Sequence, residues 1–284
     1  LEQQASRLLP IILMGDLAQD FGFGLTDDLR AAVQKTLDAL PTFQVHEGGF
    51  RWWADMRPTS ADPYLTAYVL HVAGLAQKSG FRVDDRVLSE ARQWLGTALR
   101  RRPDDKRVPP LSADEAVFVV WVLGSQKEPI ADIIPVIASE RSRLGRAAKS
   151  FLLAAVAGLP GQEDLVDSLV RDITAGVAVK ASEVLFPEAD TQQRYQGLAR
   201  GDVATTAAAI LALTAARPDS PLLAGLVAHL MAVRSNGRWQ TTHENGLALL
   251  ALTAWYSARE RTMPDFRLTP WVGDTPLATW TFRG

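Results

Sequence analysis

The chain has 284 residues, and its 30 Lys and Arg side chains nearly balance its 32 Asp and Glu side chains, which leaves a formal net charge of −2. Hydrophobic residues make up 47% of the sequence and charged residues 22%, a composition typical of globular proteins that excludes a disordered chain. Without an excess of positive charge the chain has no field to recruit nucleic acid or an anionic membrane, so we expect neither as a partner.

The chain opens with Leu1, Glu2, Gln3 and Gln4 and no initiating Met, so we expect it to be a processed or excised piece of a longer protein. It contains no cysteine, which excludes disulfides, cysteine-ligated zinc and a cysteine nucleophile within these residues. The longest strongly apolar run, 117–123, is far shorter than a membrane span of roughly 18 residues or more.

Helical periodicity of the apolar residues covers almost every long segment and predicts about eleven helices. Several have start signals, such as Thr26 before two aspartates and a capping box from Ser112 to Glu115. The expected helices are 4–17, 26–40, 61–78, 84–102, 112–125, 130–143, 146–159, 163–175, 203–216, 221–233 and 244–261.

The expected helices alternate between two kinds. One kind is apolar nearly all round, as expected of helices surrounded by protein, and the other has an apolar stripe with charges opposite. The first kind comprises 117–123, 151–157, 207–216 and 247–254, and the second comprises 26–40, 84–102 and 163–175. An inner helix followed by an outer one predicts an all-α fold, a double-layered α/α toroid of about six helical hairpins.

The C-terminal segment has a different pattern. Apolar and aromatic residues from Phe266 to Phe282, with Gly273 and Asp274 between them, predict one or two short β-strands around a turn. We therefore divide the chain into a toroid domain, 1–263, and a β tail, 264–284, that leads into or belongs to a neighbouring β domain.

Most signatures of enzyme chemistry are missing from the sequence. His243 and Glu244 begin a zinc-protease motif, but the fifth position, where the second histidine ligand belongs, is Leu247. No pair of histidines has the spacing of metal ligands on a helix, so we expect no metal and no cofactor. The acidic pairs at 27–28, 84–85 and 104–105 suit a toroidal glycosidase, in which two carboxylates flank the bond, but are more typical of helix caps and turns.

The first residues, placed at the head of an all-α toroid, resemble the Cys-x-Glu-Gln motif of the thioester-containing, complement-like domain of bacterial α2-macroglobulins, where Cys-Leu-Glu-Gln is typical. Three further segments look like the toroid repeats of that family. They are Gly-Gly-Phe-Arg-Trp-Trp at 48–53 with Asp-Pro-Tyr-Leu-Thr-Ala-Tyr at 62–68, Asp-Val-Ala-Thr-Thr at 202–206, and Asn-Gly-Arg-Trp-Gln-Thr-Thr-His-Glu-Asn at 236–245. The resemblance spans 1 to about 261.

The resemblance implies the thioester domain of a broad-spectrum protease inhibitor, which is not an enzyme because its bond reacts once. In the family, the cysteine sulfur and the glutamine three positions later form an internal thioester. By position, Glu2 and Gln3 belong to this motif, Gln3 supplies the acyl carbon, and the cysteine is expected just before Leu1. A protease that cuts a bait region elsewhere in the parent exposes the bond, and a protease lysine attacks it.

Family members that prefer hydroxyl acceptors use a histidine at a position corresponding to about 106–115 here, where this sequence has none. The four histidines, His46, His71, His229 and His243, lie elsewhere, so we expect amine acceptors to be favoured.

The resemblance also implies a location, because members of the family look periplasmic and are often membrane-anchored lipoproteins. The partners that it implies are target proteases, the parent's other domains and a peptidoglycan-synthesising penicillin-binding protein. Two other functions stay open, an α/α-toroid enzyme of the glycosidase or cyclase kind, and a structural or interaction domain without a thioester.

Overall fold

A computed structural model describes residues 1–20, 24–55, 61–101, 110–175, 177–180, 183–185, 201–259, 266–269, 271–272, 275–276 and 280–282. Eleven α-helices lie within these residues, close to the ranges that the periodicity predicts. They are α1 (Glu2–Asp20), α2 (Asp27–Asp38), α3 (Pro63–Lys78), α4 (Asp85–Leu99), α5 (Ala113–Ser125), α6 (Ile134–Ser139), α7 (Arg146–Val156), α8 (Glu163–Thr174), α9 (Asp202–Ala216), α10 (Leu222–Ala232) and α11 (Thr242–Arg259).

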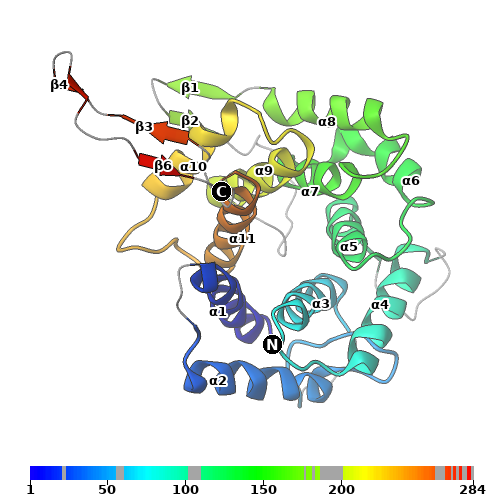
Figure 1. Ribbon diagram of the computed structural model, residues 1–284. Helices are drawn as coiled ribbons and strands as arrows, with labels where there is room; N and C mark the ends of the chain where they lie inside the picture. Colours follow the sequence, from blue (N-terminus) through cyan, green and yellow to red (C-terminus); the bar gives the residue numbers. More distant parts are fainter. Residues whose placement is uncertain are drawn as a thin grey trace.

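The odd-numbered helices form a closed inner ring. Each packs on the next in the order α1, α3, α5, α7, α9 and α11, and α11 closes the ring by packing on α1 (Figure 1). The middle of each inner helix is apolar on all sides because protein surrounds it. In α3, for example, 13 of the 16 residues are buried. The double-layered all-α toroid predicted from the sequence is confirmed.

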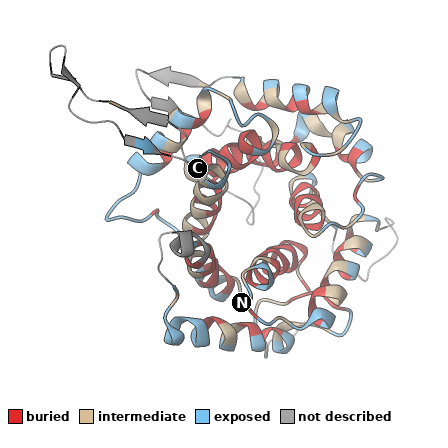
Figure 2. Ribbon diagram, viewed as in Figure 1, coloured by how far each residue is buried: buried red, intermediate tan, exposed pale blue. Residues whose placement is uncertain are grey.

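The even-numbered helices lie outside the ring. Helices α2, α4 and α8 each turn an apolar stripe inward and their charged residues to solvent, so their outer faces are exposed (Figure 2). In α4 only 6 of the 15 residues are buried. Among the described residues α11 has no outer helix as a partner, so the toroid contains five helical hairpins and one further inner helix rather than six hairpins.

Two predicted start signals are present as local hydrogen bonds. Ser112 Oγ accepts the backbone N–H of Glu115 at 3.2 Å, and the Glu115 carboxylate accepts the N–H of Ser112 at 2.8 Å, which completes the capping box of α5. Thr26 Oγ1 accepts the N–H of Leu29 at the start of α2. These bonds satisfy backbone donors that have no partner inside the helix.

One helix is much shorter than its prediction. The expected helix 130–143 is reduced to α6, and a turn of 3-10 helix, Arg141–Arg143, follows it. Pro135 sits in the first turn of α6. A proline favours a helix start at this position and lacks the N–H that a longer helix would need there, so the chain before it forms turns.

The strands of the structure form three two-stranded antiparallel ladders. Strands β3 (Phe266–Leu268) and β6 (Trp280–Phe282) pair, as do β4 (Trp271–Val272) and β5 (Thr275–Pro276), and all four fall in the predicted C-terminal β segment. A further hairpin, β1 (Ala178–Lys180) with β2 (Glu183–Leu185), was not predicted, because strands of three residues are too short to show an alternating pattern. The division into two domains at 263 stays a prediction.

Aromatic side chains from neighbouring inner helices fill part of the ring core. Phe118 of α5 lies with its ring centroid 5.3 Å from Tyr64 of α3 and 5.2 Å from Phe151 of α7, the latter edge to face. Trp121, one turn further along α5, contacts Phe151 at 4.9 Å and His71 of α3 at 4.6 Å. Offset and edge-to-face pairs of this kind add to the free energy gained by burying the rings.

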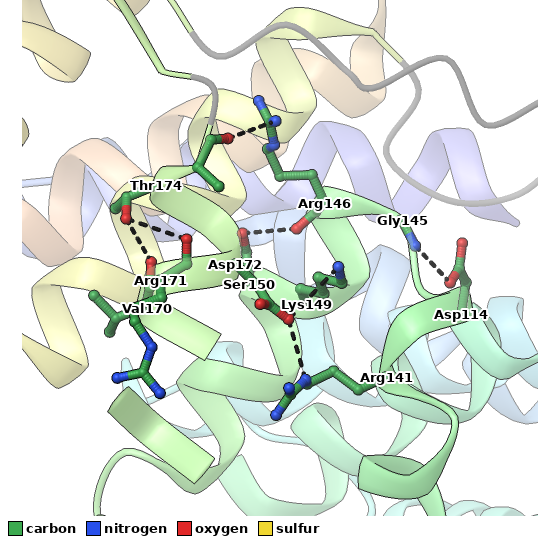
Figure 3. Close-up of polar contacts among 11 residues, drawn as sticks. Asp114, Arg141, Gly145, Arg146, Lys149, Ser150, Val170, Arg171, Asp172 and Thr174 are labelled. Atoms are coloured by element: carbon green, nitrogen blue, oxygen red, sulfur yellow. Dashed lines mark hydrogen bonds and ion pairs between the residues drawn. The ribbon is translucent and has the colours of Figure 1, made fainter. Parts of the chain in front are cut away.

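Polar contacts hold the outer helix α8 against the inner helix α7 (Figure 3). One carboxylate oxygen of Asp172, on α8, forms two ion pairs. It lies 3.1 Å from Arg141 Nε and 3.6 Å from Nζ of Lys149, on α7. Arg146, the first residue of α7, donates to the backbone carbonyl of Ala175 at 3.0 Å, just beyond the end of α8. The side chains of the ion cluster are all partly buried, so solvent screens it less than an exposed pair.

We expect His71 to make the toroid sensitive to acid. It is buried within α3, and neither ring nitrogen has a hydrogen-bond partner in the described part of the chain. Burial, helped by the positive charge of Lys78, lowers the pKa of His71 from 6.5 to about 4. The folded protein therefore keeps His71 neutral while the unfolded chain binds a proton below pH 6.5.

We expect stability to fall as the pH decreases from about 6.5 towards 4, and His71→Leu to remove this component. When the pH is lowered from 7 to 4.5, the wild type should lose about 2 kcal/mol more unfolding free energy than the variant. Denaturant titrations of both proteins at the two pH values provide the measurement. An unchanged difference between the variant and the wild type would show that His71 does not titrate in this range.

Candidate functional site

The start of α1 places the predicted motif residues on two different sides of the helix. Leu1 precedes the helix, and its carbonyl accepts the backbone N–H of Ala5 at 3.0 Å. Glu2 is partly buried and its side chain turns toward the ring, whereas Gln3 is exposed. Consecutive helical residues are about 100° apart, so the Gln3 side chain leaves the helix in a different direction from Glu2.

Gln3 is one of the residues that line a cleft of about 750 Å³. The lining comes from residues 1–4, from the 3-10 helix Leu40–Phe43 and from the segment that leads to α3. The described lining residues are Leu1, Glu2, Gln3, Gln4, Phe43, Trp52, Trp53, Ala54 and Asp55. A solvent-accessible amide at the first turn of an inner helix therefore faces a hollow with aromatic walls.

The turn before the tryptophans depends on a glycine. Gly48 has a φ of +104°, and a Cβ atom there would lie 2.5 Å from the backbone oxygen of Glu90, so no other residue fits without a shift of the backbone. The turn lets Gln44 and Phe50 pair as an antiparallel bridge. Phe50 is fully buried and anchors the segment in the core.

Hydrogen bonds connect this segment to both α3 and α1. Asp62, the N-cap of α3, accepts the backbone N–H of Leu65 at 2.8 Å and the indole Nε1–H of Trp52 at 3.2 Å. The backbone carbonyl of Trp52 in turn accepts a hydrogen bond at 3.0 Å from the Leu1 nitrogen, which is an ammonium in this chain and a backbone N–H where a residue precedes it. The two segments singled out in the sequence, 48–53 and 62–68, thus position the start of α1.

A polar cluster on the inner helices holds the Glu2 side chain, while Trp52 binds the neighbouring Leu1. The Ser6 hydroxyl donates to the Glu2 carboxylate at 2.6 Å and lies 3.0 Å from the Tyr68 hydroxyl. Tyr64 stacks beside Tyr68, and its hydroxyl lies 3.2 Å from Nδ1 and 3.3 Å from Nε2 of His243, at the start of α11. Three inner helices, α1, α3 and α11, contribute to this cluster.

Burial sets the protonation of the cluster. It raises the pKa of Tyr64 well above the ordinary value, an effect increased by nearby negative charge, and it raises the pKa of Tyr68 to about 12. Burial also lowers the pKa of His243, against the opposite influence of the Glu2 carboxylate. At neutral pH both tyrosines keep their hydroxyl protons and His243 is a neutral imidazole.

His243 is far from the motif along the sequence, and the structure brings it to the cluster beside Glu2. His243 is 179 residues from its partner Tyr64, so only the closure of the ring by α11 brings the two together. Sequence reasoning also missed Ser6 as a partner of Glu2. The i, i+4 spacing on α1 was a usable signal, because residues four apart lie on the same face of a helix.

The second glycine-tryptophan segment serves packing. Asn236 and Gly237 both have positive φ angles at the turn, and the Trp239 side chain is only 5% exposed. Its Nε1–H donates to the carbonyl of Leu230, and the Asn245 side chain bonds both the N–H and the carbonyl of Trp239. Trp239 therefore packs against the end of α10.

The acidic pairs weighed for a glycosidase belong to helix starts. Asp27 and Asp28 lie in the first turn of α2. Asp84 is the N-cap of α4, and Asp85 follows it in the first turn. The pair 104–105 lies outside the described residues. Within the described ranges no three His, Asp or Glu side chains are grouped to hold a metal ion, and no helix combines the length and apolar character of a membrane span.

No family model and no curated protein matches this sequence. The closed α/α toroid, however, matches solved structures over nearly its whole length. One is Salmonella α2-macroglobulin reacted with methylamine, with a TM-score of 0.69 and 19% sequence identity, covering 99% of this chain and 18% of that one. Another is native Escherichia coli α2-macroglobulin from domain MG7 to the C-terminus, with a TM-score of 0.68 and 20% identity, covering 99% and 43%.

A third is Escherichia coli α2-macroglobulin activated by porcine elastase, with a TM-score of 0.67 and 19% identity, covering 99% of this chain and 24% of that one. The chain thus has the fold of a region in the C-terminal part of bacterial α2-macroglobulins. At these identities the likeness is one of fold, and the chain spans about a fifth of the length of the Salmonella protein.

Proposed function

We propose that this chain is the thioester domain of a bacterial α2-macroglobulin-like protease inhibitor, in which Gln3 supplies the acyl carbon and a cysteine directly before Leu1 in the parent supplies the sulfur. The observation that carries the proposal is the position of Leu1-Glu2-Gln3. Leu1 directly precedes the first inner helix of a macroglobulin-like toroid, Glu2 and Gln3 begin that helix, and Gln3 lines a cleft.

The first turn of α1 suits a thioester for a physical reason. The first four backbone N–H groups of a helix have no partner inside it, and the helix dipole is positive at this end. A thioester carbonyl held there gains hydrogen-bond donors that stabilise the negative charge on its oxygen when a nucleophile attacks. The hydrogen bonds from Leu1 to Trp52 and from Ser6 to Glu2 hold in place the two residues that lie between the expected cysteine and Gln3.

The reaction forms an amide. The neutral amine of a protease lysine attacks Cδ of Gln3, the C–S bond breaks, and the sulfur leaves as a thiol that carries the proton lost by the nitrogen. The Salmonella relative was solved after reaction with methylamine, and Escherichia coli relatives after activation by elastase or trypsin. A protein of this fold that reacts with methylamine and responds to proteases supports the same behaviour for the parent of the present chain.

The location and further partners of the parent follow from the same proposal. We infer a periplasmic protein, membrane-anchored as a lipoprotein, whose target proteases become linked to Gln3. Contact with a peptidoglycan-synthesising penicillin-binding protein and with other domains of the parent belongs to this proposal. Cell fractionation of the intact parent tests the compartment, and a purely cytosolic protein would contradict it.

Methylamine provides the test of the reactive bond. In the intact parent, one thiol should appear for each molecule that reacts, and methylamine should be found on the side chain of Gln3. Thiol titration and peptide mass spectrometry measure the two events. A parent with cysteine before Leu1 that releases no thiol would contradict the proposal, and so would a parent without that cysteine.

A further inference from the structure

The cleft beside Gln3 has an aromatic wall. Trp53 is 60% exposed, an unfavourable state for a large apolar ring. It lies against Trp52, with ring centroids 6.2 Å apart and planes tilted by 39°. Because Trp52 bonds both Asp62 and Leu1, the wall is fixed relative to the start of α1.

The ionisable side chains that line the cleft share one sign of charge. Among the described lining residues the ionisable side chains are Glu2 and Asp55, and no basic side chain is among them. Glu2 accepts a hydrogen bond from Ser6, whereas Asp55 is exposed and has no ion pair with a described residue. An exposed carboxylate beside an exposed indole suits a ligand with an apolar stem and a positively charged end.

We propose that Trp53 and Asp55 form an acceptor subsite that holds the side chain of the attacking lysine, with its methylene stem along the Trp53 ring and its nitrogen near Asp55. This inference rests on the proposed function, because it names the residues that select the nucleophile for Gln3. The subsite raises the concentration of lysine beside the acyl carbon and orients the nitrogen toward it.

The carboxylate acts on the charge that forms during attack. A lysine ammonium first releases one proton to water, and the free amine then bonds to Cδ of Gln3, which places positive charge on the nitrogen until its second proton leaves with the sulfur as a thiol. Asp55 stabilises this transient charge. Trp53 acts on the stem, so its contribution depends on the length of the amine.

A comparison of two amine reagents distinguishes the effect of the subsite from the reactivity of the thioester itself. In the intact parent, the rate of thiol release is measured with methylamine, which has no stem, and with Nα-acetyl-lysinamide, which has the whole lysine side chain. Trp53→Ala should lower the rate with the lysine derivative about tenfold and leave the methylamine rate within about twofold. Trp53→Phe, which keeps an aromatic face, should restore most of the difference.

Asp55→Asn should lower the rate of thiol release with the lysine derivative about threefold at low ionic strength. At high salt the variant and the wild type should react at the same rate, because salt screens an exposed charge. Val136→Ala on α6 and Asp164→Asn on α8 are matched controls, an exposed apolar residue and an exposed acid outside the cleft, and neither should change either rate.

If Trp53→Ala lowers the rates of thiol release with both amines equally, or lowers neither rate, the proposal of an acceptor subsite is wrong, while the proposal of a thioester is unaffected. If the wild-type parent releases no thiol with either amine, the proposed function itself fails and the subsite with it.

Discussion

Gln3→Ala is expected to abolish covalent capture of proteases by the parent protein, while Gln4→Ala leaves it intact. Both glutamines are exposed at the first turn of α1 and line the same cleft, so the two variants remove the same chemistry from neighbouring positions. Only Gln3 has the motif spacing from a cysteine before Leu1. Conjugates with trypsin or elastase should fall at least a hundredfold in Gln3→Ala and change less than about twofold in Gln4→Ala.

Denaturing gels of the parent after protease challenge measure the conjugates. Neither variant should lose stability, because an exposed residue in the first turn of a helix contributes little to the core. Conjugates that persist in Gln3→Ala, or that disappear equally in both variants, would show that Gln3 is not the acyl donor.

Phe118→Ala is expected to have the largest effect on stability. The Phe118 ring is 1% exposed and lies between inner helices, in contact with Tyr64, Trp121 and Phe151. Removing it leaves a cavity that the close-packed helices fill only in part, so the unfolding free energy should fall by about 3–5 kcal/mol. Domains are stable by only about 5–15 kcal/mol, so this loss is a large part of the total.

Denaturant unfolding measures this loss, and Phe118→Leu should show a smaller loss because it keeps part of the volume. Val136→Ala, at an exposed apolar side chain on α6, should change the unfolding free energy by less than about 0.5 kcal/mol. A small effect of Phe118→Ala would mean that the aromatic contacts do not hold the ring together.

The helices could be predicted from the sequence because their solvent environments differ. An inner helix such as α9 is apolar on every side, and an outer helix such as α8 is not, so the alternation along the chain already indicates two layers. The hairpin of β1 and β2 gave no such signal because each strand has three residues. The shortening of α6 follows from Pro135, a local effect that periodicity does not detect.

The candidate site could be predicted only where it is local in sequence. Glu2 and Gln3 were chosen from a short motif, and their role in a thioester stays a prediction. The cleft depends on Trp52, 51 residues from its partner Leu1, and the polar cluster depends on His243, which α11 brings to Tyr64 by closing the ring. Pairings at such distances are set by the packing of whole helices, which no local pattern records.

Mass spectrometry of the Gln3 peptide after protease challenge shows whether Gln3 is the acyl donor. In the intact parent mixed with trypsin or elastase, we expect an amide that joins Cδ of Gln3 to the Nζ atom of a protease lysine, together with one free thiol on the cysteine before Leu1. An unmodified Gln3 in parent that has been cut by the protease, or a protease joined at another residue, would contradict it.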